Sequence, residues 1–204
     1  MSDRRSRVAG IVLAAGRSSR LGIPKQLIEF RGEPLVRRVG KTVADAGASV
    51  VVVVVGAEIA RVSQALAGFS FTRMVVNEHW QNGLASSLAA GIREVQCLDT
   101  RADGVLITTS DQPLVSVEAL AEMLNAFDEG SRLVAAAYSG TIGVPAVVAF
   151  EHFEELLALD GDAGAGRWLR TKGDAVRRIA MPEAAVDIDT ADDVAMLSAM
   201  ANTS

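Results

Sequence analysis

The sequence predicts an α/β protein built as three layers, with a mostly parallel sheet covered by helices on both faces. Apolar runs of strand length alternate with segments of helical periodicity along most of the 204 residues. Several of these runs lack polar alternation, which is typical of strands that are buried on both faces. Half of the residues are hydrophobic but only 4% are aromatic, so the expected core is aliphatic.

The expected strands are apolar runs that are rich in β-branched residues. Residues 8–15 form such a run and end in a glycine-containing loop, and residues 50–55 are six consecutive valines bounded by Gly56. A turn at Ser139-Gly140 is expected to join two later strands. The full set of expected strands is 8–15, 50–55, 73–76, 104–109, 133–138, 145–150 and 176–180.

Helices are expected where apolar residues recur at intervals of three and four positions. Leu35, Val39 and Val43 follow this spacing in the first such stretch, and Asn82 precedes a later one as its expected cap. The full set of expected helices is 34–46, 57–67, 84–95, 117–127, 151–159, 163–172 and 191–201.

The bulk properties limit the number of domains and the kinds of partner. No internal repeat or linker interrupts the pattern, so we expect one domain over residues 1–204. A net charge of −5 argues against nucleic acid as the main partner. The first apolar run is too short for a membrane span and unlike a secretory signal, so we expect a cytoplasmic protein without a membrane partner. Cys97 is the only cysteine, which excludes an intrachain disulfide.

The loop after the first expected strand combines close backbone approach with positive charge. It begins with Leu13, Ala14, Ala15 and Gly16. Small residues let a ligand approach the backbone, whose successive N–H groups can bind an anion. Three cations follow within nine residues, namely Arg17, Arg20 and Lys25. The loop therefore suits a triphosphate, although it matches neither GxGxxG nor a Walker A loop. The alternative is an ordinary connection with solvated basic side chains.

Carboxylates follow two other expected extended segments. Asp111 lies just after a buried strand and is a candidate Mg²⁺ ligand, although a turn or a helix cap would also suit it. Asp187 and Asp189 alternate onto the same side of a short extended segment, where their repulsion favours a bound cation. Thr190 and Asp193 are expected to form a capping box at the start of the last helix.

Residues 13–25 read Leu-Ala-Ala-Gly-x-Ser-x-Arg-x-Gly-x-x-Lys. This pattern resembles the signature of the nucleotidyltransferases that include the molybdenum cofactor guanylyl- and cytidylyltransferases. Further matches follow in order along nearly the whole chain, at Asn77-x-x-Trp80-x-x-Gly83-x-x-x-Ser87-Leu88, Asp111-Gln112-Pro113, Gly143-x-Pro145, Gly161-Asp162-x-Gly164-Ala165 and Asp187-Ile188-Asp189-Thr190. Ala15 and the Asp-Gln-Pro motif are typical of the cytidylyl branch, since the guanylyl branch usually has a second glycine where Ala15 stands.

The resemblance implies a Rossmann-like nucleotidyltransferase fold and Mg²⁺-dependent transfer of CMP from CTP to molybdopterin, with release of pyrophosphate. A molybdoenzyme that receives the product is an implied partner. The implied catalytic residues are Arg20, Lys25 and Asp111. The implied metal ligands are Asp111, Asp189 and Asp187. The implied nucleotide-binding residues are Leu13, Ala14, Ala15, Gly16, Arg20, Lys25, Asn77, Gly83 and Ser87.

Three other functions stay open at this point. The same chemistry could use GTP, or a different acceptor such as a sugar or polyol phosphate. A loop after a strand can also hold NAD(P)H in an oxidoreductase, although GxGxxG is missing and carboxylates stand where a metal would bind. A nucleotide-binding module without turnover could serve as a chaperone for a molybdoenzyme.

Overall fold

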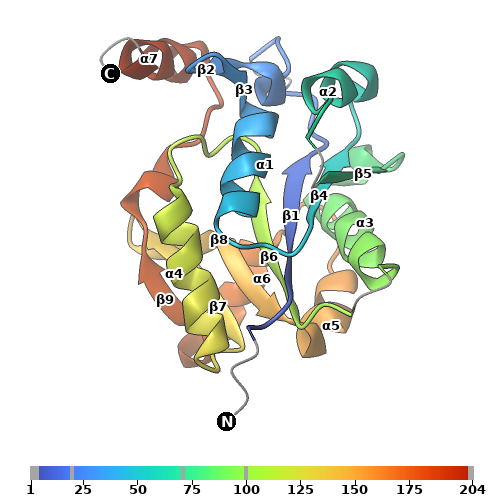
Figure 1. Cartoon of the computed structure of the whole chain (residues 1–204), viewed down its shortest axis with the longest axis vertical. Helices are drawn as coiled ribbons and strands as arrows, with labels where there is room; N and C mark the ends of the chain where they lie inside the picture. Colours follow the sequence, from blue (N-terminus) through green and yellow to red (C-terminus); the bar gives the residue numbers. More distant parts are fainter. Residues whose placement is uncertain (1–4, 19–20, 70–71, 99–100, 202–204) are drawn as a thin grey trace.

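The computed structural model describes residues 5–18, 21–69, 72–98 and 101–201. Within these ranges, seven strands form one sheet in the order β5-β4-β1-β6-β8-β7-β9 (Figure 1). The strands are β1 (Val8–Ala14), β4 (Val51–Val55), β5 (Thr72–Val76), β6 (Gly104–Thr109), β7 (Leu133–Tyr138), β8 (Thr141–Ala149) and β9 (Arg177–Ala180). A separate two-stranded sheet consists of β2 (Glu29–Phe30) and β3 (Glu33–Pro34).

The sheet is mostly parallel, as the sequence predicts. β8 runs antiparallel to both of its neighbours, β6 and β7, and the remaining pairs are parallel. The parallel pairing of β1 with β6 brings the carboxyl ends of these two strands to the same edge of the sheet. Ligands of open α/β sheets bind beyond this edge, so the loops that follow β1 and β6 lie where a site is expected.

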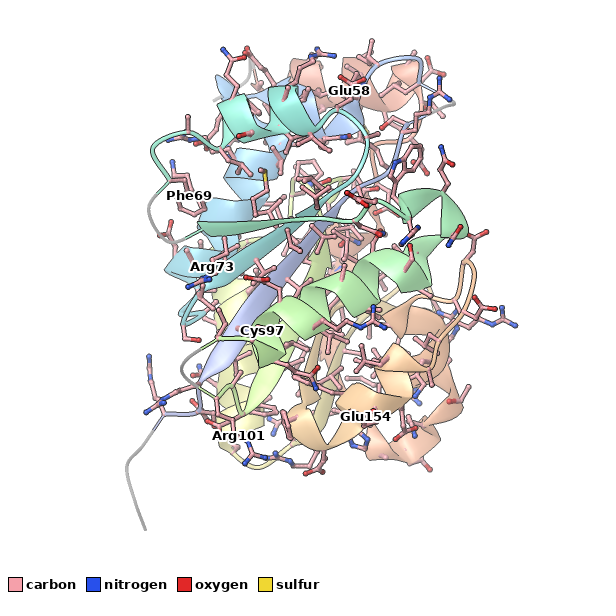
Figure 2. The ribbon with its side chains drawn as sticks, turned by 90° about the vertical axis from the view of Figure 1, so that its right-hand side faces the viewer. Glu58, Phe69, Arg73, Cys97, Arg101 and Glu154 are labelled. Atoms are coloured by element: carbon pink, nitrogen blue, oxygen red, sulfur yellow. The ribbon has the colours of Figure 1, made fainter. Side chains whose placement is uncertain are left out.

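Helices cover both faces of the sheet and complete the three predicted layers (Figures 1 and 2). The α-helices are α1 (Leu35–Asp45), α2 (Ile59–Ala65), α3 (Leu84–Gln96), α4 (Val117–Asp128), α5 (Phe153–Leu157), α6 (Ala165–Thr171) and α7 (Ala191–Ala201). The core residues of α1, α2 and α4 pack on one face, and those of α3, α5 and α6 pack on the other. No helix in the described ranges is both long and apolar enough to cross a membrane.

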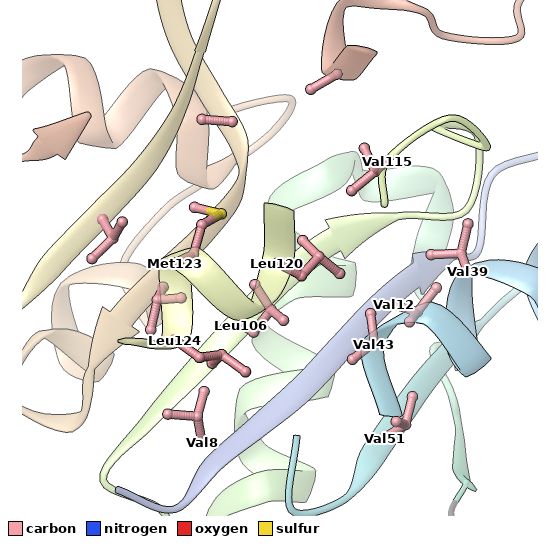
Figure 3. Packing of buried hydrophobic residues seen from close by; sticks show 14 of the residues in the cluster. Val8, Val12, Val39, Val43, Val51, Leu106, Val115, Leu120, Met123 and Leu124 are labelled. Atoms are coloured by element: carbon pink, nitrogen blue, oxygen red, sulfur yellow. The ribbon is translucent and has the colours of Figure 1, made fainter. Parts of the chain in front are cut away.

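The valine run of β4 contributes side chains to the hydrophobic clusters on both faces of the sheet. Val51, Val53 and Val55 belong to the cluster under α1 and α4, part of which Figure 3 shows. Val52 and Val54 belong to the cluster under α3. All five side chains are fully buried, and alternation of side chains along a strand sends them to opposite faces. A run without polar residues is therefore what this internal strand requires.

Three features of the structure differ most from the sequence expectation. β8 begins at Thr141 rather than at 145, because the turn residues Ser139 and Gly140 both adopt positive φ and close a two-residue hairpin. The stretch 25–34, for which no element was expected, forms the 3₁₀ turn η1 (Lys25–Leu27) and the small sheet. Asn82 was wrong as the cap of α3, because Gly83 occupies that position with φ of 100°.

The remaining 3₁₀ turns lie in the connections around the sheet. They are η2 (Trp80–Asn82), η3 (Phe150–His152), η4 (Gly173–Ala175) and η5 (Pro182–Ala185). The helix expected at 151–159 is shorter than predicted, since η3 precedes α5 and α5 ends at Leu157. α7 packs beside β2, where Leu197, Ile188 and Phe30 share a small third cluster. This cluster fixes the segment that carries Asp187 and Asp189 at the carboxyl edge of the main sheet.

Candidate active site

A cleft of about 380 Å³ opens beyond the carboxyl ends of β1 and β6. Eight of the site residues that the resemblance implies line this cleft, namely Leu13, Ala14, Ala15, Gly16, Lys25, Gly83, Ser87 and Asp111, and Arg17 of the same loop lines it as well. They come from three segments that are far apart in the sequence, so the fold brings together what the motifs suggested. Arg20 lies outside the described residues. Asn77, Asp187 and Asp189 are described but do not line the cleft.

Internal hydrogen bonds brace the loop after β1. The hydroxyl of Ser18 accepts the backbone N–H of Lys25 at 2.9 Å, and Ser18 itself adopts a φ of 56°. Gln26, whose exposed fraction is 1%, donates through Nε2 to the carbonyl of Gly16 at 3.3 Å. These contacts hold the loop in a closed turn and fix the backbone of Lys25. The side chain of Lys25 can therefore reach across the cleft from a rigid base.

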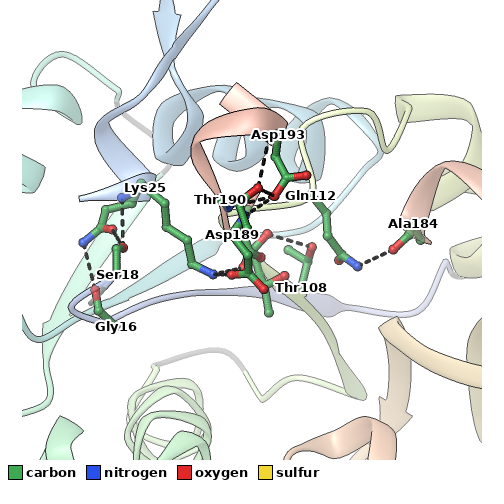
Figure 4. A network of polar contacts seen from close by, with 12 residues as sticks. Gly16, Ser18, Lys25, Thr108, Gln112, Ala184, Asp189, Thr190 and Asp193 are labelled. Carbon is green, nitrogen blue, oxygen red and sulfur yellow. Dashed lines mark hydrogen bonds and ion pairs between the residues drawn. The ribbon is translucent and has the colours of Figure 1, made fainter. Parts of the chain in front are cut away.

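The ammonium group of Lys25 joins two carboxylates from distant parts of the chain (Figure 4). Its Nζ forms ion pairs with Oδ2 of Asp111 and, at 2.9 Å, with Oδ1 of Asp189. Burial alone would lower the pKa of Lys25. The charges and hydrogen bonds of Asp111 and Asp189 outweigh that effect and raise the pKa of Lys25 above its ordinary value. Lys25 therefore stays charged at neutral pH.

Asp187 is the third carboxylate at this edge, and it resists ionisation. Although much of the residue's surface is exposed, the surrounding protein withdraws water from its carboxyl group, which raises the pKa of Asp187 to about 6. The negative charges of Asp111 and Asp189 act in the same direction. Carboxylates that repel one another in this way favour a proton or a cation between them.

Backbone contacts hold the carboxylate segments in place. The N–H of Ile188 donates to the carbonyl of Asp111 at 3.1 Å, so the loop after β6 and the segment before α7 are joined directly. The capping box predicted at the start of α7 is present. Oδ2 of Asp193 accepts the N–H of Thr190 at 2.8 Å, and the hydroxyl of Thr190 accepts the N–H of Asp193 at 3.3 Å.

The donor set fits a divalent cation. Oδ1 of Asp111 is buried and has no hydrogen-bond partner among the described residues, whereas Oδ2 is engaged by Lys25. A buried carboxylate oxygen without a partner is costly, and a cation would satisfy it. The described residues contain no cluster of three potential ligands, so the three carboxylates do not form a ready-made cage. Mg²⁺ commonly needs only one or two carboxylates, with water and phosphate oxygens completing its shell.

The opposite wall of the cleft is the start of α3. The carbonyl of Gly161 accepts the N–H of Ala85 at 3.0 Å, so the loop before α6 docks on the first turn of α3. A Cβ on Gly83 would lie 2.3 Å from the carbonyl oxygen of Gly161, which explains the glycine there. The docked loop brings Asp162 to the cleft beside Ser87 and the half-buried Trp80. This wall offers a hydroxyl, a carboxylate and an aromatic ring to a ligand.

Asn77 has a different place from the one that the resemblance implies. Its side chain is 5% exposed, and its Nδ2 donates to the hydroxyls of Ser86 at 2.9 Å and Ser87 at 3.0 Å. Its Oδ1 accepts the N–H of His79 at 3.0 Å. Asn77 thus stabilises the first turn of α3 through hydrogen bonds and orients Ser87, which lines the cleft. Trp168 on α6 is only 7% exposed and packs in the core.

Four polar residues around the cleft had no firm role from the sequence. Ser18 and Gln112 stand inside the quoted motifs, and Gln26 directly follows the first of them, but their bracing contacts depend on the fold. Asp162 stands in the Gly161-Asp162-x-Gly164-Ala165 motif, and the structure places it at the cleft. The available signal for such bracing residues was a polar side chain within or next to a motif that had no obvious chemical role.

Comparisons with known proteins agree with this architecture. The model of the MobA-like NTP transferase domain matches residues 10–177. Nicotine blue oxidoreductase from Paenarthrobacter nicotinovorans is 35% identical over 175 residues, which cover 81% of this chain and 82% of that protein. The crystal structure of Rv0371c from Mycobacterium tuberculosis H37Rv superposes with a TM-score of 0.78 at 27% identity, covering 94% of this chain and 98% of that one. Its complex with manganese gives a TM-score of 0.76 at 26% identity, covering 98% of this chain and all of that one.

Proposed function

The chain belongs to the MobA-like NTP transferase domain family, and from that premise we propose that it transfers CMP from CTP to molybdopterin, within a single domain, with release of pyrophosphate. One observation carries the proposal. Lys25 and two carboxylates converge at the end of a cleft that the small residues Ala14, Ala15 and Gly16 also line. Such an edge combines room for phosphates with opposite charges that can be rearranged around them.

The proposed reaction joins two phosphates. An oxygen of the acceptor phosphate forms a bond to the α-phosphorus of CTP, and the bond from that phosphorus to the bridging oxygen of the β-phosphate breaks. Pyrophosphate leaves with the electron pair. Transfer of this kind depends on alignment and charge neutralisation rather than on a protein nucleophile. The chain has only two histidines and one cysteine, so it is poorly equipped for covalent catalysis and better suited to alignment.

Lys25, together with a Mg²⁺ ion held by the carboxylates, would offset the negative charge of the triphosphate. Asp111 and Asp189 would hold Mg²⁺, with Asp187 beside them, and a bound Mg²⁺ neutralises phosphate charge and orients the α- and β-phosphate oxygens. Nζ of Lys25 now pairs with both of these carboxylates. When the nucleotide binds, the ammonium group would turn toward the phosphates and offset the charge that builds on pyrophosphate. Arg20 is proposed to assist it.

The base and sugar would lie against the start of α3. Ser87 has a hydroxyl that already accepts a hydrogen bond from Asn77, so its own proton is free to be donated to the base. Ala15 is 4% exposed and its carbonyl accepts the N–H of Ala57 at 3.1 Å, which leaves little room beneath the base. We propose that the smaller pyrimidine ring is preferred at this wall, and a comparison of the Kd of CTP with that of GTP tests the preference.

A second candidate function has support from one relative. Nicotine blue oxidoreductase shares 35% identity over most of both chains, so this fold and much of this sequence are compatible with an oxidoreductase. The loop after β1 could then accommodate the phosphates of NAD(P)H. Asp111 after β6 and Asp189 before α7 favour nucleotidyl transfer. A site that binds the pyrophosphate of a dinucleotide cofactor at this edge of the sheet does not require carboxylates.

Analysis of the reaction product separates these candidates. The purified protein would be incubated anaerobically with Mg²⁺, molybdopterin and, in separate reactions, each of the four ribonucleoside triphosphates. The masses of the products would be determined by mass spectrometry. A conjugate with the mass of molybdopterin plus CMP minus one water supports the proposal, and the corresponding GMP conjugate would support the guanylyl alternative. Oxidation of NADH or NADPH by a quinone-like dye, without any conjugate, would support the oxidoreductase instead.

A further inference from the structure

Arg38 on α1 contacts a segment that carries the candidate active site, although it does not line the cleft itself. Its Nε donates to the carbonyl of Pro113 at 3.2 Å. Pro113 lies two positions after Asp111, so this hydrogen bond connects α1 with the loop that carries the carboxylate. One partly buried side chain therefore anchors the loop after β6 on a helix.

Two other hydrogen bonds of the same loop lead to the segment before α7. Nε2 of Gln112 donates to the carbonyl of Ala184 at 2.8 Å (Figure 4), and the N–H of Ile188 donates to the carbonyl of Asp111 at 3.1 Å. Neither of these contacts reaches α1. The hydrogen bond of Arg38 therefore complements them, because it joins the loop to a different part of the chain.

The guanidinium group of Arg38 also lies on the aromatic ring of Phe30 in β2. Its Cζ is 4.9 Å from the centre of the ring, and Cζ of Arg31 approaches the same ring at 5.1 Å. A cation over an aromatic face is attracted by the quadrupole of the ring. Phe30 is only 2% exposed, so its ring is a fixed surface for the guanidinium group.

Phe30 extends the connection to the second carboxylate segment. It packs with Ile188 in the third cluster, and Leu114 of the loop after β6 packs against the same cluster. Ile188 stands between the two carboxylates of the segment before α7. In Figure 1, β2 and α7 lie beside the upper end of α1. The ring that Arg38 contacts thus belongs to the packing that holds both carboxylate segments together.

The start of α1 is joined to the loop that carries Lys25 as well. The N–H of Leu35 donates to the carbonyl of Ile28 at 2.9 Å, and the N–H of Ile28 donates to the carbonyl of Lys25 at 3.1 Å. Leu35 is fully buried and lies about one turn before Arg38. Arg38 therefore stands on the helix that supports the backbone of Lys25, and it connects that helix with the loop of Asp111.

The surroundings of Arg38 differ from those of a solvated surface arginine. Burial lowers the pKa of Arg38, and the charge of Arg31 acts in the same direction, whereas Glu33 opposes both. Withdrawal of a guanidinium group from water costs free energy, so its hydrogen bond and its contact with the ring must compensate for that cost. A side chain placed at such a cost calls for a role beyond solubility.

The contacts of Arg38 become most important when the substrates bind. In the metal-free protein, the ion pair between Lys25 and Asp111 itself holds the two loops together. The proposed transfer requires this ion pair to break, because the ammonium group turns toward the phosphates and leaves the carboxylates to a metal ion. The contacts of Arg38 lie outside the cleft, so this exchange does not remove them.

We propose that Arg38 is a positioning residue, which holds the loop after β6 against the segment before α7 so that Asp111 and Asp189 keep the spacing that a divalent cation needs. This inference rests on the proposed nucleotidyl transfer and adds a residue outside the cleft to it. The predicted effect is opposite to that of charge alone. Removal of a positive charge would strengthen cation binding, whereas loss of positioning weakens it.

Metal binding in the absence of nucleotide tests this role. Mn²⁺ titration followed by electron paramagnetic resonance would compare the wild type with Arg38→Met, which keeps an unbranched apolar side chain but loses the charge and the donor. We expect the Kd of Mn²⁺ to rise about tenfold, the lower end of the usual loss when a supporting contact of a metal site is removed. The Mg²⁺ concentration that gives half-maximal turnover should rise with it.

The matched control is Arg37→Met, which removes the same charge from the neighbouring position of α1. Nη1 of Arg37 donates to the carbonyl of Ala67 at 2.7 Å, so this arginine joins α1 to the turn after α2 rather than to the carboxylate segments. Its removal should leave the Kd of Mn²⁺ unchanged. Circular dichroism at the assay temperature verifies that each variant is folded.

Arg38→Lys keeps the charge and one donor but lacks the planar group that lies on Phe30, so its Kd for Mn²⁺ should lie between those of the wild type and Arg38→Met. It also provides the comparison if Arg38→Met does not fold, since a Kd above that of the wild type is still expected. If the folded Arg38 variants bind Mn²⁺ as tightly as the wild type, or if Arg37→Met weakens binding equally, this inference is wrong while the proposed function stands. A wild type that binds Mn²⁺ but forms no conjugate with any nucleotide refutes the proposed function alone, and one that does neither refutes both.

Discussion

Nζ of Lys25 lies 2.9 Å from Oδ1 of Asp189, although 164 positions separate the two residues in the chain. The same ammonium group pairs with Asp111, so one cation holds the loops after β1 and β6 and the segment before α7 together. The side chains of Lys25 and Asp111 are 22% and 14% exposed, and that of Asp189 is 47% exposed. The Asp111 side of this pair is therefore the better shielded from solvent and the more strongly coupled.

Lys25 competes with a metal for these carboxylates. In the variant Lys25→Gln, we expect Mn²⁺ or Mg²⁺ to bind more tightly in the absence of nucleotide, because an opposing positive charge is removed. Turnover is expected to fall about 10²–10³-fold, the usual loss when one preorganised charge-stabilising group is removed. Mn²⁺ titration followed by electron paramagnetic resonance measures the first effect. The control is Lys41→Gln, since Lys41 pairs with Glu33 away from the cleft; weaker metal binding by Lys25→Gln than by this control would contradict the account.

Asp187 should make the metal-free protein less stable as the pH rises. Its pKa is raised in the folded state from 3.8 to about 6, so the folded chain binds the proton more tightly than the unfolded chain does. By linkage, stability is lost as the pH increases from about 4 to about 6, and the penalty is complete above that range. Asp187→Asn removes the charge and should raise the melting temperature at pH 7.5 in EDTA.

At pH 4 the gain should be much smaller, because that pH lies well below the folded pKa of about 6 and close to the ordinary pKa of 3.8, so most of the penalty has not yet developed. The matched control is Asp45→Asn at the exposed end of α1. A gain at pH 4 equal to that at pH 7.5, or no gain at either pH, would show that the carboxylates do not repel Asp187 as described. Thermal unfolding monitored by circular dichroism is sufficient.

Alanine substitution at two glycines of the cleft should affect different properties, stability at Gly83 and nucleotide binding at Gly16. Gly83→Ala places a methyl group 2.3 Å from the carbonyl of Gly161 at a φ of 100°, so we expect a loss of about 1–3 kcal/mol in the free energy of unfolding. Gly16→Ala meets nothing within 4 Å, and Gly16 does not adopt the left-handed conformation. Its stability should be unchanged, but its KM for the nucleotide should rise because the methyl group stands where phosphates approach the backbone. Denaturant unfolding and steady-state kinetics distinguish the two; equal stability of both variants would contradict this description of the loop at Gly161.

Thr190→Ala tests the capping box that ends the carboxylate segment. The substitution removes the hydroxyl that accepts the N–H of Asp193, and loss of such a cap typically costs about 1 kcal/mol. Because α7 fixes the segment that carries Asp189, we also expect weaker Mn²⁺ binding. Ser198→Ala is the control, since its hydroxyl donates only to the carbonyl of Val194 one turn back within the same helix. Identical unfolding of the two variants would argue against the cap as a stabilising element.

Much of the fold follows from local sequence signals. A run of valines permits few structures other than an internal strand, and the rule that ligands bind at strand ends identified Lys25 and Asp111. Other features depend on contacts between distant segments. Asn82 looked like a cap for α3, but the loop at Gly161 accepts the Ala85 N–H in place of a side-chain cap. No local pattern carries that information.

The role of Asn77 shows a second limit of sequence reasoning. A polar residue at a strand end is a reasonable ligand contact, yet Asn77 is buried and uses its amide on Ser86, Ser87 and His79. The approach of α6 to β8 shows a third limit. A Cβ on Gly166 would lie 3.2 Å from Cα of Gly143, and no local pattern around either glycine indicates that they meet. Residue type and motif spacing predicted which side chains gather at the carboxyl edge of the sheet, but they did not predict which surface each side chain faces.

Metal-dependent release of pyrophosphate tests the central claim most directly. Purified wild type and Asp111→Asn would be incubated with molybdopterin and CTP, with and without Mg²⁺, while release is followed by a coupled colorimetric assay. The account predicts release by the wild type only when CTP and metal are both present, and loss of release in Asp111→Asn under conditions where circular dichroism shows that this variant is folded. Equal release by the two proteins, or release that persists in excess EDTA, would contradict it.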